Sequence, residues 1–285
     1  EDIFSFLNLY LPEYQEQVKI GDMHYNMEQK IRLNQKICSE LETMAKTLYD
    51  YWFVQFDFPD ENGRPYRTSG GEMVWNSKLK QRIPKGWNVG PLSCAISSIN
   101  TGLNPRDNFK LGNGKVQYIT VKNITTSGTL DFTSCDTVDE QAQKVIHARS
   151  DISAGDILFA SIAPLGRCYL IQETPTDWDI NESVFSIRCN NDVVTSEFLY
   201  MYFMGDMFIK SATSSSTGSI FKGIRINTLL DLNAILPSKN IVDLFSKQVQ
   251  KLLALKEQKV KENLEIVKLR DWLLPMLMNG QARVE

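Results

Sequence analysis

A heptad seam between Met27 and Trp52 restricts the fold of this 285-residue chain more than any other feature of its sequence. Apolar side chains recur there at alternating spacings of four and three residues, which places them on one face of a helix. At about 1.5 Å per residue, a helix of roughly 26 residues is about 39 Å long. Such a face must be covered by another helix. The seam, which only Asn34 interrupts, consists of Met27, Ile31, Cys38, Leu41, Ala45, Leu48 and Trp52.

A second, weaker apolar stripe follows Pro237 and predicts the covering helix. Lys256, Asn263 and Arg270 stand at inner positions where apolar residues are expected, and polar residues at such positions fix the register or the partner of a helix pair. The two helices are therefore expected to pair, within one chain or between two copies. The residues expected to make this pairing are Ile31, Leu41, Leu48 and Trp52 on the first helix and Val249, Leu253, Val260 and Val267 on the second.

Between the two stripes the apolar period shortens to that of β-strands. Strands are predicted at 116–121, 157–163, 168–172 and 184–188, and a helix at 196–208 that opens at Ser196 and Glu197. The predicted fold class is α+β: one globular domain of short mixed strands and helices, flanked by two long coiled-coil-type helices.

The expected boundaries follow from the turn signals. They give an N-terminal segment 1–24 broken by Pro12 and Gly21, a first long helix 25–56, a connecting segment 57–91, a globular domain 92–237, and a second helix with tail 238–285. Pro275 and Asn279-Gly280 are expected to close the second helix. The connecting segment is expected to be exposed and pinned by Tyr66, Trp75 and Trp87.

Composition limits the compartment and the partners. No apolar run reaches the roughly 20 residues that span a bilayer, and the first residues are acidic, so a cytoplasmic protein without a membrane partner is expected. The five cysteines are scattered without a C-x-x-C pair, which argues against disulfides and zinc. A net charge of −3 gives no overall attraction to nucleic acid, so any DNA contact must be local or shared with a partner.

Catalytic motifs are weak. With two histidines, His24 and His147, neither nucleophile activation by histidine nor a histidine-rich metal site is easily built. The run 112–115, Gly-Asn-Gly-Lys, lacks the earlier glycine of a phosphate loop and is interpreted as a hairpin turn. No dinucleotide-binding glycine motif is visible, so no cofactor is expected. The carboxylates between Asp57 and Glu61 are interpreted as solvated turn residues.

Two runs of sequence carry a resemblance to a known family. Residues 36–87 contain K-I-C-S-E-L-E, then A-K-T-L-Y-D-Y-W-F-V-Q-F-D-F-P, then S-G-G and I-P-K-G-W, and residues 269–281 read L-R-D-W-L-L-P-M-L-M-N-G-Q. These runs resemble the spacer and the closing tail of type I restriction-modification specificity subunits. The block between them, with G-L-N-P at 102–105 and I-A-P-L-G at 162–166, resembles the target-recognition domain of that family.

The resemblance covers nearly all of residues 25–285 and implies a function. The usual subunit of the family has two recognition domains, whereas this chain has one and looks like a half-length form. The family's specificity subunit reads a bipartite double-stranded DNA target and docks modification and restriction subunits, without a catalytic site or cofactor of its own. Two copies paired antiparallel through the long helices would restore two recognition domains, so a homodimer is expected. The spacer of about 39 Å is close to the 34–36 Å that separates half-sites by one DNA turn.

Polar and basic loop residues of the recognition domain are the candidates for contacts to DNA, because amide and guanidinium groups can pair with base edges in the major groove. These candidates are Arg106, Lys122, Asn123, Arg149, Arg167, Ser216, Thr217, Ser219, Lys222 and Arg225.

Two other functions remain open at this point. The first is a coiled-coil adaptor whose α+β domain binds a protein or a glycan, which the acidic composition favours. The second is an enzyme with a catalytic carboxylate pair, which depends on the Asp57 to Glu61 cluster alone.

Overall fold

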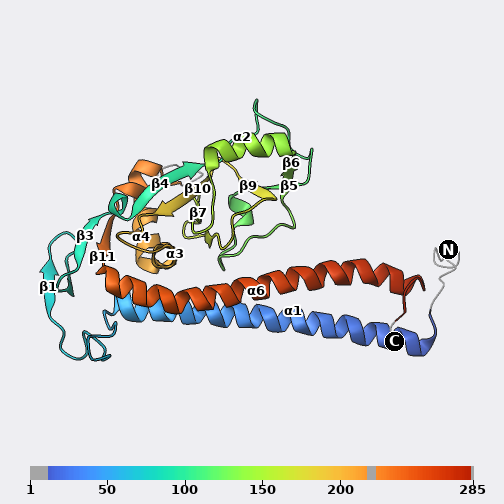
Figure 1. Cartoon of the computed structure of the whole chain (residues 1–285), viewed down its shortest axis with the longest axis horizontal. Coiled ribbons are helices and arrows are strands. Elements are labelled where there is room, and N and C mark those ends of the chain that lie inside the picture. Colours follow the sequence, from blue (N-terminus) through green and yellow to red (C-terminus); the bar gives the residue numbers. More distant parts are fainter. Residues whose placement is uncertain (1–11, 217–222, 284–285) are drawn as a thin grey trace. The chain divides into compact units, whose positions relative to one another are not determined.

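The computed structural model describes residues 12–216 and 223–283, and it contains both long helices and a mixed set of short strands (Figure 1), so the predicted α+β class is confirmed. The α-helices are α1 (Tyr14–Tyr49), α2 (Glu140–Ser150), α3 (Ser196–Met204), α4 (Asp206–Ser215), α5 (Ile226–Leu230) and α6 (Lys239–Met278). The strands are β1 (Met73–Asn76), β2 (Gln81–Pro84), β3 (Asn88–Pro91), β4 (Ile96–Thr101), β5 (Val116–Ile119), β6 (Asp136–Val138), β7 (Ile157–Ala160), β8 (Cys168–Leu170), β9 (Trp178–Ile180), β10 (Val184–Cys189) and β11 (Asn233–Leu236).

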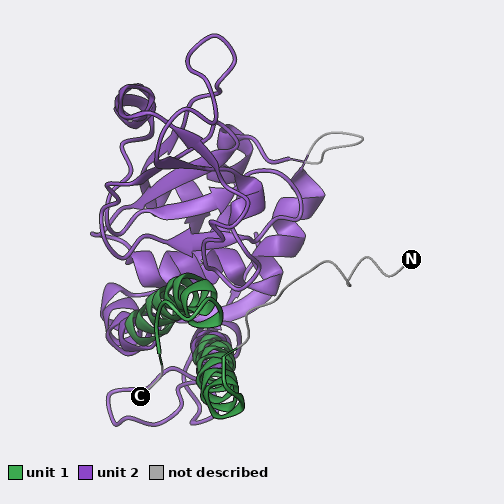
Figure 2. Ribbon diagram, turned by 90° about the vertical axis from the view of Figure 1, so that its right-hand side faces the viewer, with its two compact units in different colours: residues 1–42, 254–285 green, residues 43–253 purple. Residues whose placement is uncertain are grey.

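The chain divides into two compact units (Figure 2). Unit 1 comprises residues 1–42 and 254–285, and unit 2 comprises residues 43–253. In the part of the chain that the structure describes, no helix is long and apolar enough to cross a membrane.

Unit 1 is an antiparallel pair of helical segments held by polar contacts at the inner seam. Each of the three polar seam residues of α6 meets a polar partner on α1. Lys256 Nζ lies 3.4 Å from a carboxylate oxygen of Glu42, Asn263 accepts a hydrogen bond of 2.9 Å from the Asn34 amide, and Arg270 pairs with Glu28. As the residue numbers rise along α6, those of the partners on α1 fall, as in any antiparallel helix pair. The polar positions of the two helices therefore fix one register within a single chain.

Asn34 and Asn263 form the most buried polar layer of unit 1. Asn34 is fully buried and its amide donates to Asn263, while its own oxygen has no hydrogen-bond partner among the described residues. We expect Asn34→Leu alone to lower the free energy of unfolding by about 1–3 kcal/mol, because it leaves the Asn263 oxygen without its donor. The double variant Asn34→Leu/Asn263→Leu should recover most of this loss. Urea unfolding of the four proteins of a double-mutant cycle measures the coupling, and additive losses would contradict the paired layer.

The ends of the long helices differ from the expectation in two places. Gly21 lies inside α1, so the break expected there is wrong; a glycine weakens a helix by about 1 kcal/mol but does not stop it when the flanking residues propagate. Pro275 also lies inside α6, which continues to Met278 and stops at Asn279-Gly280, where Gly280 has a φ of 67°. The glycine signal at the C-terminal end was therefore correct and the proline signal was not.

An aromatic cluster forms the core of unit 2 where α1 ends. The last turn after α1 is a π-helix, Asp50–Val54, which buries Trp52 and Phe53. The ring of Phe53 makes edge contacts with Phe198 of α3 and Phe245 of α6, at centroid distances of 4.8 and 4.9 Å. Val249 and Leu253 extend the same core along α6. These contacts attach the rest of unit 2 to the parts of α1 and α6 that belong to it.

Two sheets form the centre of unit 2. One has four antiparallel strands in the order β4-β10-β7-β8, and the other has three strands in the order β6-β5-β9, with β5 and β9 parallel. The four strands expected from the sequence are confirmed as β5, β7, β8 and β10, although three of them are shorter than expected. The helix expected at 196–208 is divided at Gly205 into α3 and α4, and Thr195, not Ser196, caps its start by accepting from the Phe198 amide.

The run 112–115 does not form the expected hairpin turn. It leads into β5, which pairs with β6 and β9, while β4 pairs with β10, so no hairpin joins β4 and β5. Gly114 is packed so tightly that an added Cβ would lie 2.1 Å from the Val138 carbonyl oxygen. The glycine is required by packing against a neighbouring strand.

The connecting segment is more ordered than expected. β1 and β2 form a separate two-stranded hairpin, and β3 pairs with β11. Trp87 stacks on Phe58, which in turn stacks on Tyr66, at centroid distances of 4.9 and 4.6 Å, so two of the three aromatic residues expected to pin the segment do so. Trp75 does not: 65% of its surface is exposed.

Candidate nucleic-acid interface

Five loops of unit 2 meet at one edge of its two sheets, and we call residues 102–106, 120–124, 161–167, 181–183 and 223–225 the loop edge. β4 and β7 end there and β10 begins there, because β10 runs antiparallel to both; the parallel strands β5 and β9 also end there. Backbone hydrogen bonds tie these loops together in a row from one sheet to the other.

The row of backbone contacts begins at β5 and ends beside α5. The Asn181 amide donates to the Ile119 carbonyl, the Gly102 amide to the Asn181 carbonyl, and the Ser161 amide to the Ser183 carbonyl. The Ile224 amide then donates to the Ser161 carbonyl at 2.9 Å. A ligand that lies along this edge would meet all five loops at once.

Five of the predicted DNA-binding residues lie on the loop edge, four of them cations and the fifth Asn123. Arg106 and Arg225 are exposed, and Arg225 directly precedes α5. Lys122 is exposed and lies 3.8 Å from a carboxylate oxygen of Asp136. Arg167 is half-buried, and its guanidinium donates to the carbonyl oxygens of Pro164 and Ile124. Burial lowers the pKa of Arg167, yet arginine remains charged at neutral pH.

Asn123 must be removed from the candidates. Its side chain is fully buried, its oxygen accepts from the Thr120 amide and hydroxyl, and its amide donates to the Asp131 carbonyl. Asn123 therefore closes the turn after β5 and presents no free group to a base. In the sequence Asn123 looked suitable for a base contact because its amide can donate and accept hydrogen bonds. The same groups can instead bond to the backbone of a turn, as they do here.

Arg149 lies away from the loop edge. It occupies the last turn of α2, shortly before the start of β7, whereas the loop edge gathers at the end of β7. The remaining candidates are less well defined by the structure. Ser216 directly follows α4 and donates its hydroxyl to the Thr213 carbonyl, while Thr217, Ser219 and Lys222 lie outside the described residues.

Two residues on the loop edge were missed in the sequence. Asn104 donates to a carboxylate oxygen of Glu182 at 2.6 Å, and the other oxygen of Glu182 is buried without a hydrogen-bond partner in the described structure. The pair links the loop after β4 to the loop before β10. The Gly-Leu-Asn-Pro run was a visible turn signal, but its partner lies 78 residues away, which no local pattern could indicate.

A partly buried network, centred on the buried Asp156, joins β7 and β10 at the end opposite the loop edge. The Arg188 guanidinium donates to both carboxylate oxygens of Asp156, each at 2.8 Å, and to Asp151 and the Ser153 hydroxyl. These hydrogen bonds, above all those that Asp156 accepts, raise the pKa of Arg188. Because Arg188 is fully engaged by carboxylates, it is a structural residue.

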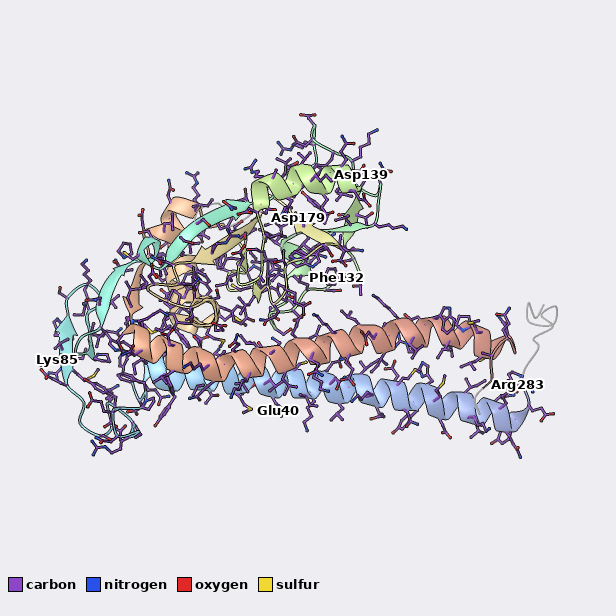
Figure 3. All side chains as sticks on the ribbon, viewed as in Figure 1. Glu40, Lys85, Phe132, Asp139, Asp179 and Arg283 are labelled. Atoms are coloured by element: carbon purple, nitrogen blue, oxygen red, sulfur yellow. The ribbon has the colours of Figure 1, made fainter. Side chains whose placement is uncertain are left out.

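A Ser-His-Asp cluster under α2 has the composition of a catalytic triad but not its geometry. The buried Asp179 (labelled in Figure 3) accepts a hydrogen bond of 2.6 Å from the Ser150 hydroxyl and contacts His147 Nδ1 at 3.1 Å. Ser150 thus donates to the carboxylate and not to the histidine that would have to remove its proton. The cluster fastens α2 to β9.

Asp179 gives unit 2 a pH-dependent contribution to stability. Burial raises its pKa, although hydrogen bonds from Ser150 and the Ile180 amide and the nearby His147 act in the opposite direction. The folded chain therefore binds this proton more tightly than the unfolded chain, and the contribution is full below about pH 3.9 and is lost as the pH rises through the raised value. The stability of the wild type relative to Asp179→Asn should fall as the pH rises from about 4 towards neutrality.

Urea unfolding of the wild type and Asp179→Asn across this range measures the difference. The exposed Asp192 provides the control, since Asp192→Asn should follow the wild type at every pH. A difference between wild type and Asp179→Asn that grows in the opposite direction would contradict the assignment.

The acidic cluster of the connecting segment is also structural. Asp57 accepts from the backbone amide and the hydroxyl of Thr68 at 2.8 and 2.7 Å, and Asp60 accepts from the amides of Asn62 and Arg64. Partial burial acts to raise the pKa of Asp57, but the hydrogen bonds from Thr68 prevail and lower it. Neither carboxylate is held ready for proton transfer. Among residues 12–216 and 223–283, no group of His, Cys, Asp and Glu could hold a metal ion.

Comparison with known families decides where this fold belongs. A model of the type I restriction modification DNA specificity domain matches residues 84–265, more than half of the chain. The chain belongs to this family. The resemblance seen in the sequence is therefore confirmed, and the matched region contains the whole loop edge.

Two curated relatives are specificity subunits. The chain is 24% identical over 275 residues, or 96% of its length, to the type I restriction enzyme MjaIX specificity subunit of Methanocaldococcus jannaschii. It is 25% identical, over 98% of its length, to the type I restriction enzyme HindI specificity subunit of Haemophilus influenzae. The chain spans 60% of the first relative and 70% of the second.

One solved structure shares the fold. The S subunit of a type I restriction-modification system from M. genitalium matches with a TM-score of 0.58 and 14% identity, over 93% of this chain and 61% of that chain. This likeness concerns the fold, including the long helices that the specificity domain carries.

Proposed function

We propose that this chain is the DNA-recognition subunit of a type I restriction-modification enzyme and reads one half of a bipartite double-stranded target. The observation that carries the proposal is the convergence of Arg106, Lys122, Arg167 and Arg225 on one edge of a domain of the specificity family. In this proposal residues 92–237 are the recognition domain, and the long helices at 25–56 and 238–285 are the spacer. The chain supplies sequence choice and uses no catalytic site or cofactor of its own.

The loop edge suits duplex DNA chemically. Arginine guanidinium groups match the two acceptors of guanine in the major groove, and each good bidentate pair contributes about 1–3 kcal/mol of discrimination against a wrong base. Arg106 and Arg225 are the exposed arginines of the edge and are assigned to bases. Lys122, a point charge already close to Asp136, is assigned to a phosphate. Ser216, Thr217, Ser219 and Lys222 are retained as proposed contacts.

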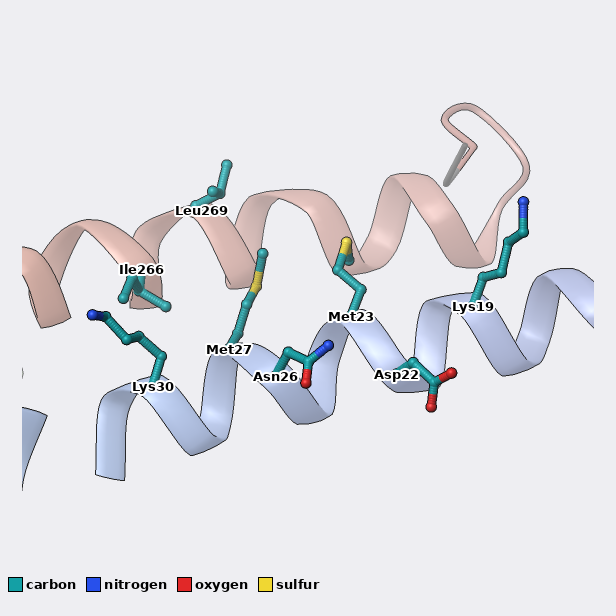
Figure 4. Close-up of a pocket in the computed structure, with 8 residues that line it drawn as sticks. All are labelled: Lys19, Asp22, Met23, Asn26, Met27, Lys30, Ile266 and Leu269. Carbon is teal, nitrogen blue, oxygen red and sulfur yellow. The ribbon is translucent and has the colours of Figure 1, made fainter. Parts of the chain in front are cut away.

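We further propose that modification and restriction subunits and a second copy of this chain are its protein partners, in the cytoplasm. Unit 1 supports this because large apolar side chains of both helices face solvent, including Tyr25, Leu33, Leu264 and Trp272. A cavity of about 540 Å³ also lies between the helices of unit 1; Met23 and Met27 point across it from α1 (Figure 4). A helix pair with this much apolar surface is typical of an incomplete bundle.

The adaptor alternative is less well supported. It would require a protein or glycan site on the α+β domain, whereas the family of the matched domain is one of DNA specificity. The enzyme alternative has lost its basis, because Asp57 and Asp60 both serve as turn acceptors.

Mapping methylated adenines in cells that carry this chain and its modification subunit tests the proposed function. One recurring motif should depend on the chain, and an interrupted inverted repeat would indicate two identical recognition domains. In the assembled enzyme, Arg106→Ala and Arg225→Ala should each weaken or relax the motif, while Arg149→Ala should do so far less. A methylation pattern that is unchanged without the chain would contradict the proposal.

Light scattering at micromolar concentration that finds monomer alone would contradict self-pairing.

A further inference from the structure

The hairpin formed by β1 and β2 lies in the most positively charged stretch of the sequence, residues 64–85. Six cationic residues and one carboxylate, Glu72, lie between residues 64 and 85, in a chain whose net charge is −3. Glu72 is occupied by Lys85 at 2.7 Å, and Arg64 is paired with Asp60. The cations that remain for a partner are Arg67, Lys78, Lys80 and Arg82, all of them exposed.

The tip of the hairpin combines these charges with an exposed aromatic ring. Trp75 of β1 is directly opposite Arg82 of β2, so both side chains project from the same face of the ribbon. Trp75 is 65% exposed, which is unusual for the largest apolar side chain. Lys78 and Lys80 lie in the turn that joins the strands, and the Asn76 side chain holds this turn by accepting from the amides of Lys78 and Leu79.

The base of the hairpin is packed into the core of unit 2, and this packing sets where the hairpin leaves the core. Phe58 stacks between Tyr66 and Trp87, and the Tyr66 hydroxyl donates to the Glu72 carbonyl immediately before β1. Ile83 and Trp87 are buried in the main core of unit 2. Figure 3 shows Lys85 beside this hairpin, at one end of unit 2.

We propose that the hairpin is a second DNA-binding surface, which holds the phosphate backbone of duplex DNA without regard to sequence. A two-stranded ribbon is one of the shapes that the major groove admits, and phosphates attract lysine and arginine. An acidic protein surface is the less suitable occupant, because the centres of protein interfaces are depleted of lysine, which the tip of this hairpin contributes twice. Lys78, Lys80 and Arg82 bind phosphates, and Trp75 packs against the sugar-phosphate wall of the groove.

This inference deepens the proposed function and rests on it, since the ligand is the same duplex. It assigns a division of labour between two surfaces of unit 2. The loop edge selects the sequence, and the hairpin adds affinity that depends on salt. Such a contact also compensates for the acidic composition of the chain, which supplies no general attraction to DNA.

Fluorescence anisotropy with the full chain and a labelled duplex of random sequence tests the inference, at salt concentrations from 50 to 200 mM. The variant Lys78→Ala/Lys80→Ala/Arg82→Ala should bind about tenfold more weakly and should lower the slope of log affinity against log salt by about 2–3, since each lost phosphate contact removes about 0.9. Trp75→Ala should weaken binding at every salt concentration and leave the slope unchanged. Circular dichroism confirms that each variant is folded.

The control removes the same charge elsewhere. Lys144 of α2 and Lys247 and Lys251 of α6 are exposed, and the variant with alanine at all three should bind within about twofold of the wild type. If the hairpin variant behaves like this control, the inference is wrong, and it is equally wrong if the hairpin variant loses only its binding to the modification subunit. In the assembled enzyme the hairpin variant should keep the methylation motif at lower occupancy. Loss of the motif with full random-duplex affinity would instead follow from damage to the loop edge.

Discussion

Gly102→Ala is expected to lower the free energy of unfolding by about 3 kcal/mol, the upper end of the cost of overpacking. An added Cβ would lie 1.7 Å from the carbonyl oxygen of Ile180 and 2.4 Å from its carbonyl carbon, and both belong to backbone that cannot rotate away. The Gly102 amide also donates to the Asn181 carbonyl, so the methyl group would push β4 and the loop before β10 apart. That loop carries Glu182 and Ser183, two residues of the loop edge.

Thermal unfolding should show a fall in Tm of roughly 6–12 °C, given about 2–4 °C for each kcal/mol in a chain of this size. Gly21→Ala is the matched control, because nothing lies within 4 Å of the added Cβ and the residue is inside α1, about two turns from its start. That control should stabilise the chain by up to about 1 kcal/mol. If the two alanine variants had similar Tm values, the close approach at Gly102 would be refuted.

A second consequence concerns target preference. Folded Gly102→Ala protein should lose discrimination between target and random duplex more than it loses affinity for random duplex, because the loop edge moves and the hairpin does not. Gly102→Ala should mainly lose discrimination between target and random duplex, whereas the hairpin variant should mainly lose affinity for random duplex. Comparison of the two variants therefore separates the loop edge from the hairpin.

The long helices could be predicted from the sequence because the apolar residues that define them recur at a short, regular spacing. The positions of Lys256, Asn263 and Arg270 in the seam predicted a register device, and each meets a polar partner on α1. Helix ends were less accessible. Gly21 and Pro275 are weak helix formers, yet both lie inside helices because the long segments that flank them are helical. Once a helix has formed, each further residue adds a hydrogen bond, so the helix extends through such positions.

The strands of the recognition block were only partly predictable. β7 is buried along its whole length and β10 at all positions but Arg188, and both carry strand signals in the sequence. β6 and β9 have three residues each and form because β5 pairs with both. Such short strands depend on long-range pairing and leave no periodic pattern. The sequence patterns located β5, β7, β8 and β10, which carry strand signals. They missed β1, β2 and β3 in the connecting segment.

The candidate site shows the same limit at the level of side chains. Residue type alone suggested Asn123 and Arg149, but the fold buries the first in a turn and places the second beyond the loop edge. Asn104 and Glu182 were missed because a contact across 78 residues is invisible to spacing. The exposed Trp75 is the opposite case: the sequence analysis treated Trp75 and Trp87 alike as anchors of the connecting segment, and the structure separates Trp87, which packs, from Trp75, which does not.

Phe245 connects the second long helix to the recognition block, and its truncation should be among the most damaging single changes in unit 2. The ring is fully buried and contacts the rings of Tyr49, Trp52 and Phe53 at centroid distances of 6.1, 5.8 and 4.9 Å. Phe245→Ala removes the ring and leaves a cavity, because the surrounding rings are held on α1 and on the π-helical turn that continues it and cannot all close in. The expected loss is about 3–5 kcal/mol of unfolding free energy.

Urea unfolding followed by tryptophan fluorescence measures this loss, since Trp52 and Trp87 lie in the same core. Phe245→Leu keeps much of the volume and should lose less than half as much as Phe245→Ala. Leu244→Ala, at the exposed neighbouring position, should change stability by about 0.5 kcal/mol or less. A loss for Phe245→Ala no larger than that for Leu244→Ala would show that the aromatic cluster does not hold α6 to the recognition block.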